Sequence, residues 1–306
     1  MFQLLVGTDF PFMKYRRIAY AISIVGVLVT VAWLVMQGGP RYSVDFTGGT
    51  VLQFRTEPAV APERVRAALD GAGLSGYELQ QISGEDGHEY LLRIRTPQST
   101  TELGGTLETA LTAQSPGTRV EVRRAELVGP KVGNELREKA VWAILGSLAG
   151  ILLYVGIRYE FKFAFGAVVA LFHDVLLTIG FLCFTNREIS LTVIAALLTI
   201  AGFSINDKVV VFDRIRERSK ALRKETHTRA MDIAVNETLS RTVITNTTVF
   251  LSALALLVWG GDVLRDFSFA TVVGILIGTY SSVYLASALA LDIWIWLDSR
   301  KSGAAK

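Results

Sequence analysis

The sequence contains one cysteine, Cys183, and three histidines among its 306 residues. A single thiol cannot form a disulfide within the chain, so any domain outside a membrane must be stable through its core alone. His88 has no cysteine or second histidine at ligand spacing, and we expect no metal site and no cofactor. The chain also lacks a GxxxxGK[ST] phosphate-binding loop, which excludes ATP as a fuel used by this chain itself.

Long apolar runs dominate the chain, of which 51% is hydrophobic. A helix needs about 20 residues to cross a hydrocarbon core. Runs of about this length or longer cover residues 18–36, 141–157, 163–184, 191–212, 242–260 and 267–296. The first run is followed by no Ala-x-Ala cleavage site, so we expect a retained anchor rather than a signal peptide. The sequence therefore predicts a membrane protein with six transmembrane helices.

Lysine and arginine are distributed unevenly among the short loops. They gather before the first run, between the second and third, and after the fourth and sixth, most densely at residues 214–229. Because cytoplasmic loops are enriched in these residues, we expect both chain ends to be cytoplasmic and the segment after the first run to be external. The net charge of +3 then reflects topology and does not indicate nucleic-acid binding.

This topology divides the chain into four parts. We assign residues 1–37 to a cytoplasmic N-terminus and the first helix, 38–139 to a periplasmic α+β domain, 140–297 to helices two to six, and 298–306 to a cytoplasmic tail. A basic cytoplasmic loop is expected within the third part, at about 213–240. Its loosely helical apolar positions favour contact with the lipid surface.

The external segment combines two periodicities. Between residues 50 and 128, strand-like and helix-like stretches follow one another in the order β-α-β-β-α-β. That order predicts a small ferredoxin-like domain. The segment shows no catalytic constellation, so we expect it to contact a partner or a passing polypeptide rather than to act as an enzyme.

A short motif, VDFTGG, precedes the first predicted strand. Gly48 and Gly49 permit positive φ or a close backbone approach, and Asp45 can accept hydrogen bonds from local amides. The motif predicts a rigid turn between the first helix and the first strand.

An aspartate interrupts the fourth apolar run, LTVIAALLTIAGFSINDKVVVF. Asp207 lies seven residues before Arg214, hence about 10 Å inside the cytoplasmic helix end. A carboxylate at that depth is costly unless it is paired, protonated or beside water, and marks a functional site by default. Asn206 precedes it. Lys208 follows it but points about 100° away on a helix, so we expect Lys208 to extend toward the cytoplasmic interface.

Arg241 opens the fifth run and is a candidate partner for Asp207. The fourth and fifth runs are antiparallel with their cytoplasmic ends joined, so the two side chains can meet. Alternating between a buried and an arginine-paired state would let Asp207 take up and release a proton. The alternative is a static salt bridge that sets helix register.

Other polar residues in or near the runs allow more than one interpretation. His173 and Asp174, in the third run, are either a second proton relay or a hydrogen-bonded helix–helix lock. Asp213, beside Arg214, favours a solvated ion pair at the membrane boundary.

Two pairs of glycines with GxxxG spacing predict close helix contacts. They are Gly146 with Gly150 and Gly274 with Gly278.

Several segments together resemble the SecF family of protein-export membrane proteins, which work with SecD beside the Sec channel. The segments are VDFTGGT, GPKVGNELREKA, ALFHD, AGFSINDKVVVFDRIRE, NETLSRTVITN and GTYSSVYLASAL. They cover nearly the whole chain in order, although DFTGG alone would also fit SecD.

The resemblance implies half of a resistance-nodulation-division (RND) transporter, with six membrane helices and one periplasmic domain. It implies a multi-pass protein of the bacterial inner membrane that uses the proton motive force in late preprotein translocation. It assigns the coupling acid and base to Asp207 and Arg241 and leaves H⁺ or Na⁺ open as the ion. Expected partners are a separate SecD-like subunit, the SecYEG channel with its accessory membrane subunits, and unfolded preproteins.

Two other functions compete with this one. The first is half of an RND-type small-solute exporter, which we expect to be a twelve-helix chain with larger outer domains. The second is a structural assembly subunit whose buried charges only hold helices together.

Overall fold

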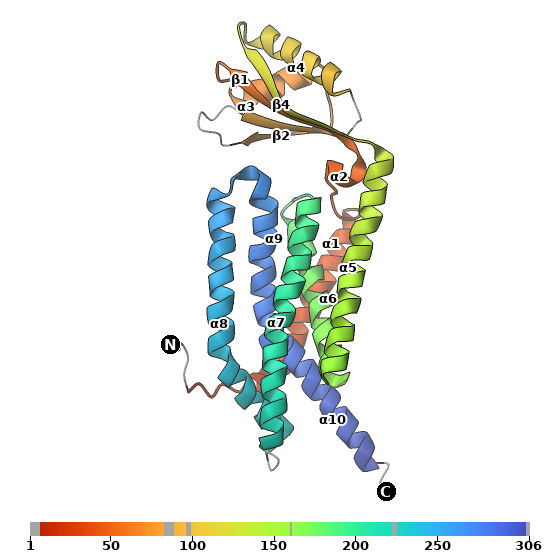
Figure 1. Ribbon diagram of the computed structural model, residues 1–306, viewed down its shortest axis with the longest axis vertical. Helices are drawn as coiled ribbons and strands as arrows, with labels where there is room; N and C mark the ends of the chain where they lie inside the picture. Colours follow the sequence, from red (N-terminus) through yellow and green to blue (C-terminus); the bar gives the residue numbers. More distant parts are fainter. Residues whose placement is uncertain (1–6, 83–88, 96–98, 160, 222–224, 304–306) are drawn as a thin grey trace.

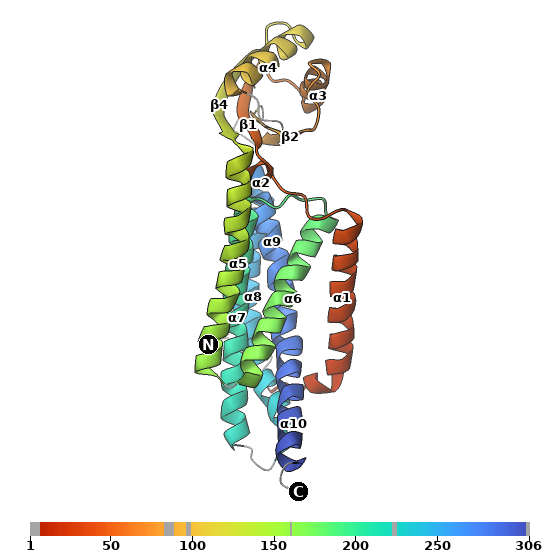
Figure 2. The same cartoon turned by 90° about the vertical axis from the view of Figure 1, so that its right-hand side faces the viewer.

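A computed structural model of the protein describes residues 7–82, 89–95, 99–159, 161–221 and 225–303, so His88 lies outside the described residues. The chain forms a bundle of long helices with a smaller domain at one end of it (Figures 1 and 2). Both ends of the described chain lie away from that domain, toward the opposite end of the bundle.

Within the described residues, six helices are long and apolar enough to cross a membrane, which confirms the predicted number. Five of them are α1 (Arg16–Met36), α5 (Pro130–Arg158), α6 (Phe161–Phe184), α7 (Leu191–Ala221) and α8 (His227–Trp259). The sixth is composite: α9 (Gly261–Tyr280), the π-helical segment η2 (Ser281–Ala286) and α10 (Ser287–Gly303). A short 3₁₀ helix, η1 (Phe12–Tyr15), precedes α1. Helix α6 contacts α1, α5, α7, α9, η2 and α10, so it occupies the centre of the bundle.

Two helices extend beyond the apolar runs that predicted them. Helix α5 begins at Pro130, before the expected domain boundary at 139, because proline is well accommodated in a first helical turn. The expected basic loop at about 213–240 is mostly helical: α7 continues to Ala221, and α8 starts at His227 after a Thr226 cap. Glu237 pairs with Arg214 and Arg218 and joins the two helices there. These ion pairs stabilise the polar ends of α7 and α8 against each other. A search for apolar runs cannot detect such polar helical segments.

The outer domain has the predicted β-α-β-β-α-β order. Its elements are β1 (Gly49–Glu57), α3 (Pro62–Gly71), β2 (Tyr77–Ile82), β3 (Glu89–Ile94), α4 (Thr100–Gln114) and β4 (Arg119–Val128). The antiparallel sheet has the order β2-β3-β1-β4, and both helices pack on one face of it. Leu69 of α3 and Leu107 of α4 meet Phe54 and Leu92 of the strands in a fully buried core. The ferredoxin-like arrangement is therefore confirmed.

The VDFTGG motif forms the junction between the two parts of the molecule. It folds as the short helix α2 (Val44–Thr47), followed by Gly48 and Gly49 at φ values of 75° and 146°. A Cβ on Gly49 would collide with the carbonyl oxygen of Ile94, and one on Gly48 would lie 2.9 Å from the Cα of Pro130. Both glycines are therefore required by backbone conformation and by close approach.

Asp45 of the same motif reaches further than we expected. Its Oδ2 accepts a hydrogen bond of 3.0 Å from the backbone N–H of Leu191, rather than from a local amide. Leu191 is the first residue of α7, so Asp45 caps that helix from another part of the chain. The junction therefore holds the outer end of α7 as well as the start of α5.

A second contact joins the outer domain to the loop before α7. Arg95 follows β3, and its Nη2 lies 3.4 Å from Oε1 of Glu188 in that loop. Burial raises the pKa of Glu188, and nearby Glu78 acts in the same direction, while Arg93 and Arg95 oppose both.

Replacing Gly49 with alanine is expected to destabilise the protein by about 1–3 kcal/mol, because a side chain there meets backbone and strains a positive-φ residue. Thermal unfolding of the purified protein measures the change. Gly105→Ala in α4 is the matched control, since a Cβ at Gly105 has no atom within 4 Å. Equal melting temperatures for the two variants would contradict this account of the junction.

Candidate functional site

A cluster of buried polar side chains lies where α6, α7 and the sixth span meet. Each member is at most 5% exposed, although the helices around it are apolar. The members are His173, Asp174, Ser204, Lys208, Ser281 and Ser282. Unsatisfied polar groups are costly inside a membrane, so the hydrogen bonds within this cluster decide what it can do.

Lys208 is the centre of the cluster and is completely buried. Its Nζ lies 2.9 Å from Oδ2 of Asp174 and donates hydrogen bonds to the hydroxyls of Ser204 and Ser281 and, at 3.4 Å, to Ser282. The expectation that Lys208 extends to the cytoplasmic interface is wrong. Its position on α7 faces α6, where a carboxylate compensates its charge.

Asp174 binds groups from three elements. Its Oδ2 accepts hydrogen bonds of 2.7 Å from both Ser204 of α7 and Ser281 of η2, in addition to the lysine. Its Oδ1 lies 3.0 Å from Nδ1 of His173. These hydrogen bonds join α6 to α7 and η2, as the helix–helix lock expects. The relay alternative for His173 and Asp174 stays a prediction; the buried Nε2 of His173 has no hydrogen-bond partner among the described residues.

The π-helical segment η2 brings two successive serines to the same ammonium group. In a regular α-helix, neighbouring side chains point about 100° apart, whereas a π turn is wider and often occurs at functional sites. The carbonyl of Gly278 accepts a hydrogen bond of 2.8 Å from Ser282 at this turn and lies 3.1 Å from the hydroxyl oxygen of Ser281. The local widening of the helix is thus part of the site.

The two glycine pairs differ in what they face. A Cβ on Gly274 would collide with Ile200, and one on Gly278 would lie 3.2 Å from Oγ of Ser204, so this pair allows α9 to approach α7 closely. Gly146 and Gly150 are exposed, and a Cβ on either would have no atom within 4 Å. Among the described residues, the helix contact expected at this second pair is absent.

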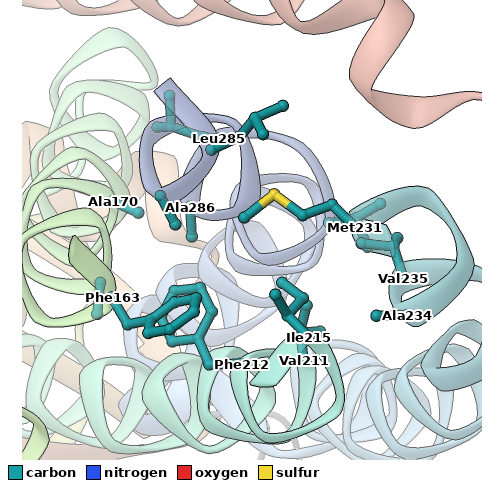
Figure 3. Close-up of a cluster of buried hydrophobic side chains, with 14 of the residues drawn as sticks. Phe163, Ala170, Val211, Phe212, Ile215, Met231, Ala234, Val235, Leu285 and Ala286 are labelled. Carbon is teal, nitrogen blue, oxygen red and sulfur yellow. The ribbon is translucent and has the colours of Figure 1, made fainter. Parts of the chain in front are cut away.

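An apolar core next to the cluster holds α7 in register. Figure 3 shows Phe212 and Ile215 of α7 packed with Phe163 of α6, Met231 of α8 and Leu285 of η2. Phe212 lies four residues after Lys208, one helical turn away. The same packing that buries these side chains therefore directs Lys208 toward Asp174.

Asp207 is 4% exposed and lies on the side of α7 that faces α8. Asn246 of α8 lies near its carboxylate and donates a hydrogen bond of 2.7 Å to Thr279, while Lys208 and Arg241 act on the carboxylate through their charges. Among the described residues no ion pair joins Asp207 to Arg241, which is exposed, as is Asn206. Sequence reasoning did not identify Asn246 as a partner, although its place among the threonines of the fifth run was a signal.

The boundary pair has other partners than we expected. Arg214 pairs with Glu217 and Glu237 rather than with Asp213, and Asp213 lies near the hydroxyl of Tyr159. Adjacent residues on a helix point apart, which is why Asp213 and Arg214 do not pair with each other.

Asp174→Asn is expected to lower the free energy of unfolding by about 3–5 kcal/mol, because it leaves the buried ammonium of Lys208 without a counter-charge. The double variant Asp174→Asn/Lys208→Met should recover most of that loss, since it removes both charges at similar volume. Denaturant titration of the purified protein measures both values. A double variant no more stable than Asp174→Asn alone would show that the unpaired charge of Lys208 is not the cause of the lost stability.

Comparisons with known proteins agree with this architecture. Residues 107–296 match the family model for the protein export membrane protein SecD/SecF, C-terminal, and residues 33–60 match the SecD/SecF GG motif. The protein translocase subunits SecF of Calditerrivibrio nitroreducens and Vibrio alginolyticus are each 40% identical to this chain. The matches cover 92% and 96% of this chain, and 93% of each relative.

Solved structures are similar as well. A crystal structure of SecDF, a translocon-associated membrane protein, from Thermus thermophilus matches 96% of this chain with a TM-score of 0.82 and 40% identity. SecDF in a super-membrane-facing form matches 100% of it with a TM-score of 0.73 and 39% identity. This chain spans 40% and 41% of those two chains.

Proposed function

The chain belongs to the SecD/SecF family, as a SecF-type protein translocase subunit, and we propose that it couples an ion gradient to late preprotein translocation. The proton motive force is the gradient that we infer, with Asp207 as the proton-carrying group. The chain contributes no enzymatic step. Its outer domain contacts the emerging polypeptide, and its membrane helices carry the proton whose gradient supplies the energy.

The observation that carries this proposal is the division of charge between two neighbouring residues. Lys208 is compensated by Asp174, so it is not an ion-pair partner of Asp207. Asp207 is buried, and the amide of Asn246 lies near it. Among the described residues, the charges of Lys208 and Arg241 act on it from further away. A carboxylate held in this way can gain or lose a proton without breaking a salt bridge. The static-salt-bridge alternative needs an Asp207–Arg241 contact that the described residues do not form.

The orientation of the chain in the membrane is inferred from the distribution of its basic residues. Basic residues of α7 and α8 cluster at the end of the bundle opposite the outer domain, and Asp9, near the N-terminus, pairs with Arg229 there. From the positive-inside rule we infer that this end is cytoplasmic, with both termini in the cytoplasm and the outer domain in the periplasm of a bacterial inner membrane.

Asp207→Asn is expected to abolish gradient-stimulated preprotein export while leaving assembly intact, because the amide keeps the shape but cannot carry a proton. Export into vesicles with controlled membrane potential and pH gradient measures this, with co-purification of the SecD-like partner in the same samples. Asp213→Asn is the matched control, an exposed carboxylate further along the same helix. Normal export by the Asp207 variant would favour the structural-subunit alternative.

Exposed small and polar residues on α7 and α8 indicate that another protein covers this face of the bundle. Gly202 and Asn206 on α7, and Arg241 and Thr248 on α8, are exposed although they belong to helices that can span a membrane. Exposed polar groups are costly against lipid, so a second membrane protein should cover them. We assign this place to a SecD-like subunit, which provides the other half of the transporter; the SecYEG channel, its accessory subunits and unfolded preproteins are further partners of the assembly.

Gly202→Leu is expected to reduce co-purification of the SecD-like subunit strongly, because leucine would fill the space that a close helix contact needs. The variant should keep its own fold, since a Cβ at Gly202 has no atom within 4 Å. Gly146→Leu on α5 has the same exposure and serves as control. Loss of the partner from the Gly146 variant instead would move the interface to α5.

A further inference from the structure

The ammonium group of Lys208 is surrounded by oxygen atoms in a way that a salt bridge does not require. Four side chains contribute one oxygen each: Asp174 at 2.9 Å, Ser281 at 3.0 Å, Ser282 at 3.4 Å, and Ser204. All four residues are at most 2% exposed. One carboxylate and three hydroxyls form a set of hard oxygen donors, the kind of ligand that hard cations prefer.

The hydrogen bonds around these oxygens orient them toward a cation. Ser204 and Ser281 donate their hydroxyl protons to Oδ2 of Asp174. A hydroxyl has one proton and two lone pairs, so both serines turn lone pairs toward the position of Nζ. Ser282 donates to the carbonyl of Gly278 and is oriented in the same way.

The backbone is also shaped for this arrangement. The π turn of η2 directs Ser281 and Ser282 to one point, and Gly278 allows α9 to approach Ser204 closely. Both features lie in the composite sixth span, and both bring hydroxyl groups toward the ammonium. Because a buried lysine and a buried aspartate can pair without any of them, they indicate a built site.

We propose that Asp174, Ser204, Ser281 and Ser282 form a monovalent-cation site that Lys208 fills with its own tethered ammonium. The lysine excludes free Na⁺ from this position in the native chain. A small neutral residue at position 208 would leave the carboxylate and the three hydroxyls in place, and Na⁺ would bind there. This inference goes beyond the proposed function, because it concerns binding at Asp174 and holds whether or not Asp207 carries protons.

The test is thermal unfolding of the full chain, purified with its SecD-like partner, in NaCl and in choline chloride at equal ionic strength and pH. Lys208→Ala should melt about 2–4 °C higher in Na⁺ at about ten times the dissociation constant, since a ligand of the folded state alone stabilises it. Binding of ²²Na⁺ should rise above the wild-type level in the same variant. The native protein should melt at the same temperature in both salts.

Three controls separate a cation site from a general effect of charge. Lys208→Met fills the space with an apolar tip and should not respond to Na⁺. Asp174→Asn/Lys208→Ala lacks the carboxylate and should not respond either. Lys220→Ala removes an exposed lysine from the same helix and should behave as the native protein does.

The proposal is overturned if Lys208→Ala folds and melts at one temperature in both salts, or if the native protein shows an equal Na⁺ response. Failure of Lys208→Ala to fold in Na⁺ as well as in choline also contradicts it, because bound Na⁺ should replace the lost ammonium. Folding in Na⁺ but not in choline would support it.

Discussion

A lysine side chain buried completely among membrane helices must have its charge compensated, and most of the inner architecture follows from how this is done. Asp174 provides the counter-charge from α6, Ser204 from α7 and Ser281 from η2 complete the hydrogen bonds, and Gly278 leaves room for the approach. The cost of an unpaired charge in hydrocarbon makes this arrangement strongly selective for one packing of the three helices. The π turn is the backbone adjustment that satisfies the lysine.

The same ion pair defines the chemistry available next to it. Lys208 faces Asp174 on α6. Because neighbouring side chains on a helix point apart, the carboxylate of Asp207 then faces α8, where it lies near Asn246. Lys208 is thereby paired with a counter-charge, whereas Asp207 has no ion-pair partner among the described residues. A single helical step of about 100° separates these two environments.

Helix α7 connects this site to the outer domain. It is one continuous helix from Leu191 to Ala221, and Asp45 of the junction caps its outer end. The junction glycines pack against the backbone of the first helical turn of α5 and of the end of β3. A shift of α7 relative to α6 would therefore be transmitted to the junction through hydrogen bonds and backbone contacts rather than through a flexible linker.

The sequence by itself determined the number of membrane helices and the ferredoxin-like domain, because each depends on periodicity and composition along one segment. It did not determine how far Asp207 lies from the helix end, since α7 continues past Arg214 to Ala221. It did not determine the partners of Asp174, Asp45 or Asp213, or that Lys208 is buried. Periodicity shows which residues share one face of a helix, but not which helix that face meets. Lys208 and Asp174 lie 34 residues apart on different helices, so only the packing of α6 against α7 and η2 could bring them together, and only that packing could turn a lysine expected at the interface into the centre of the site.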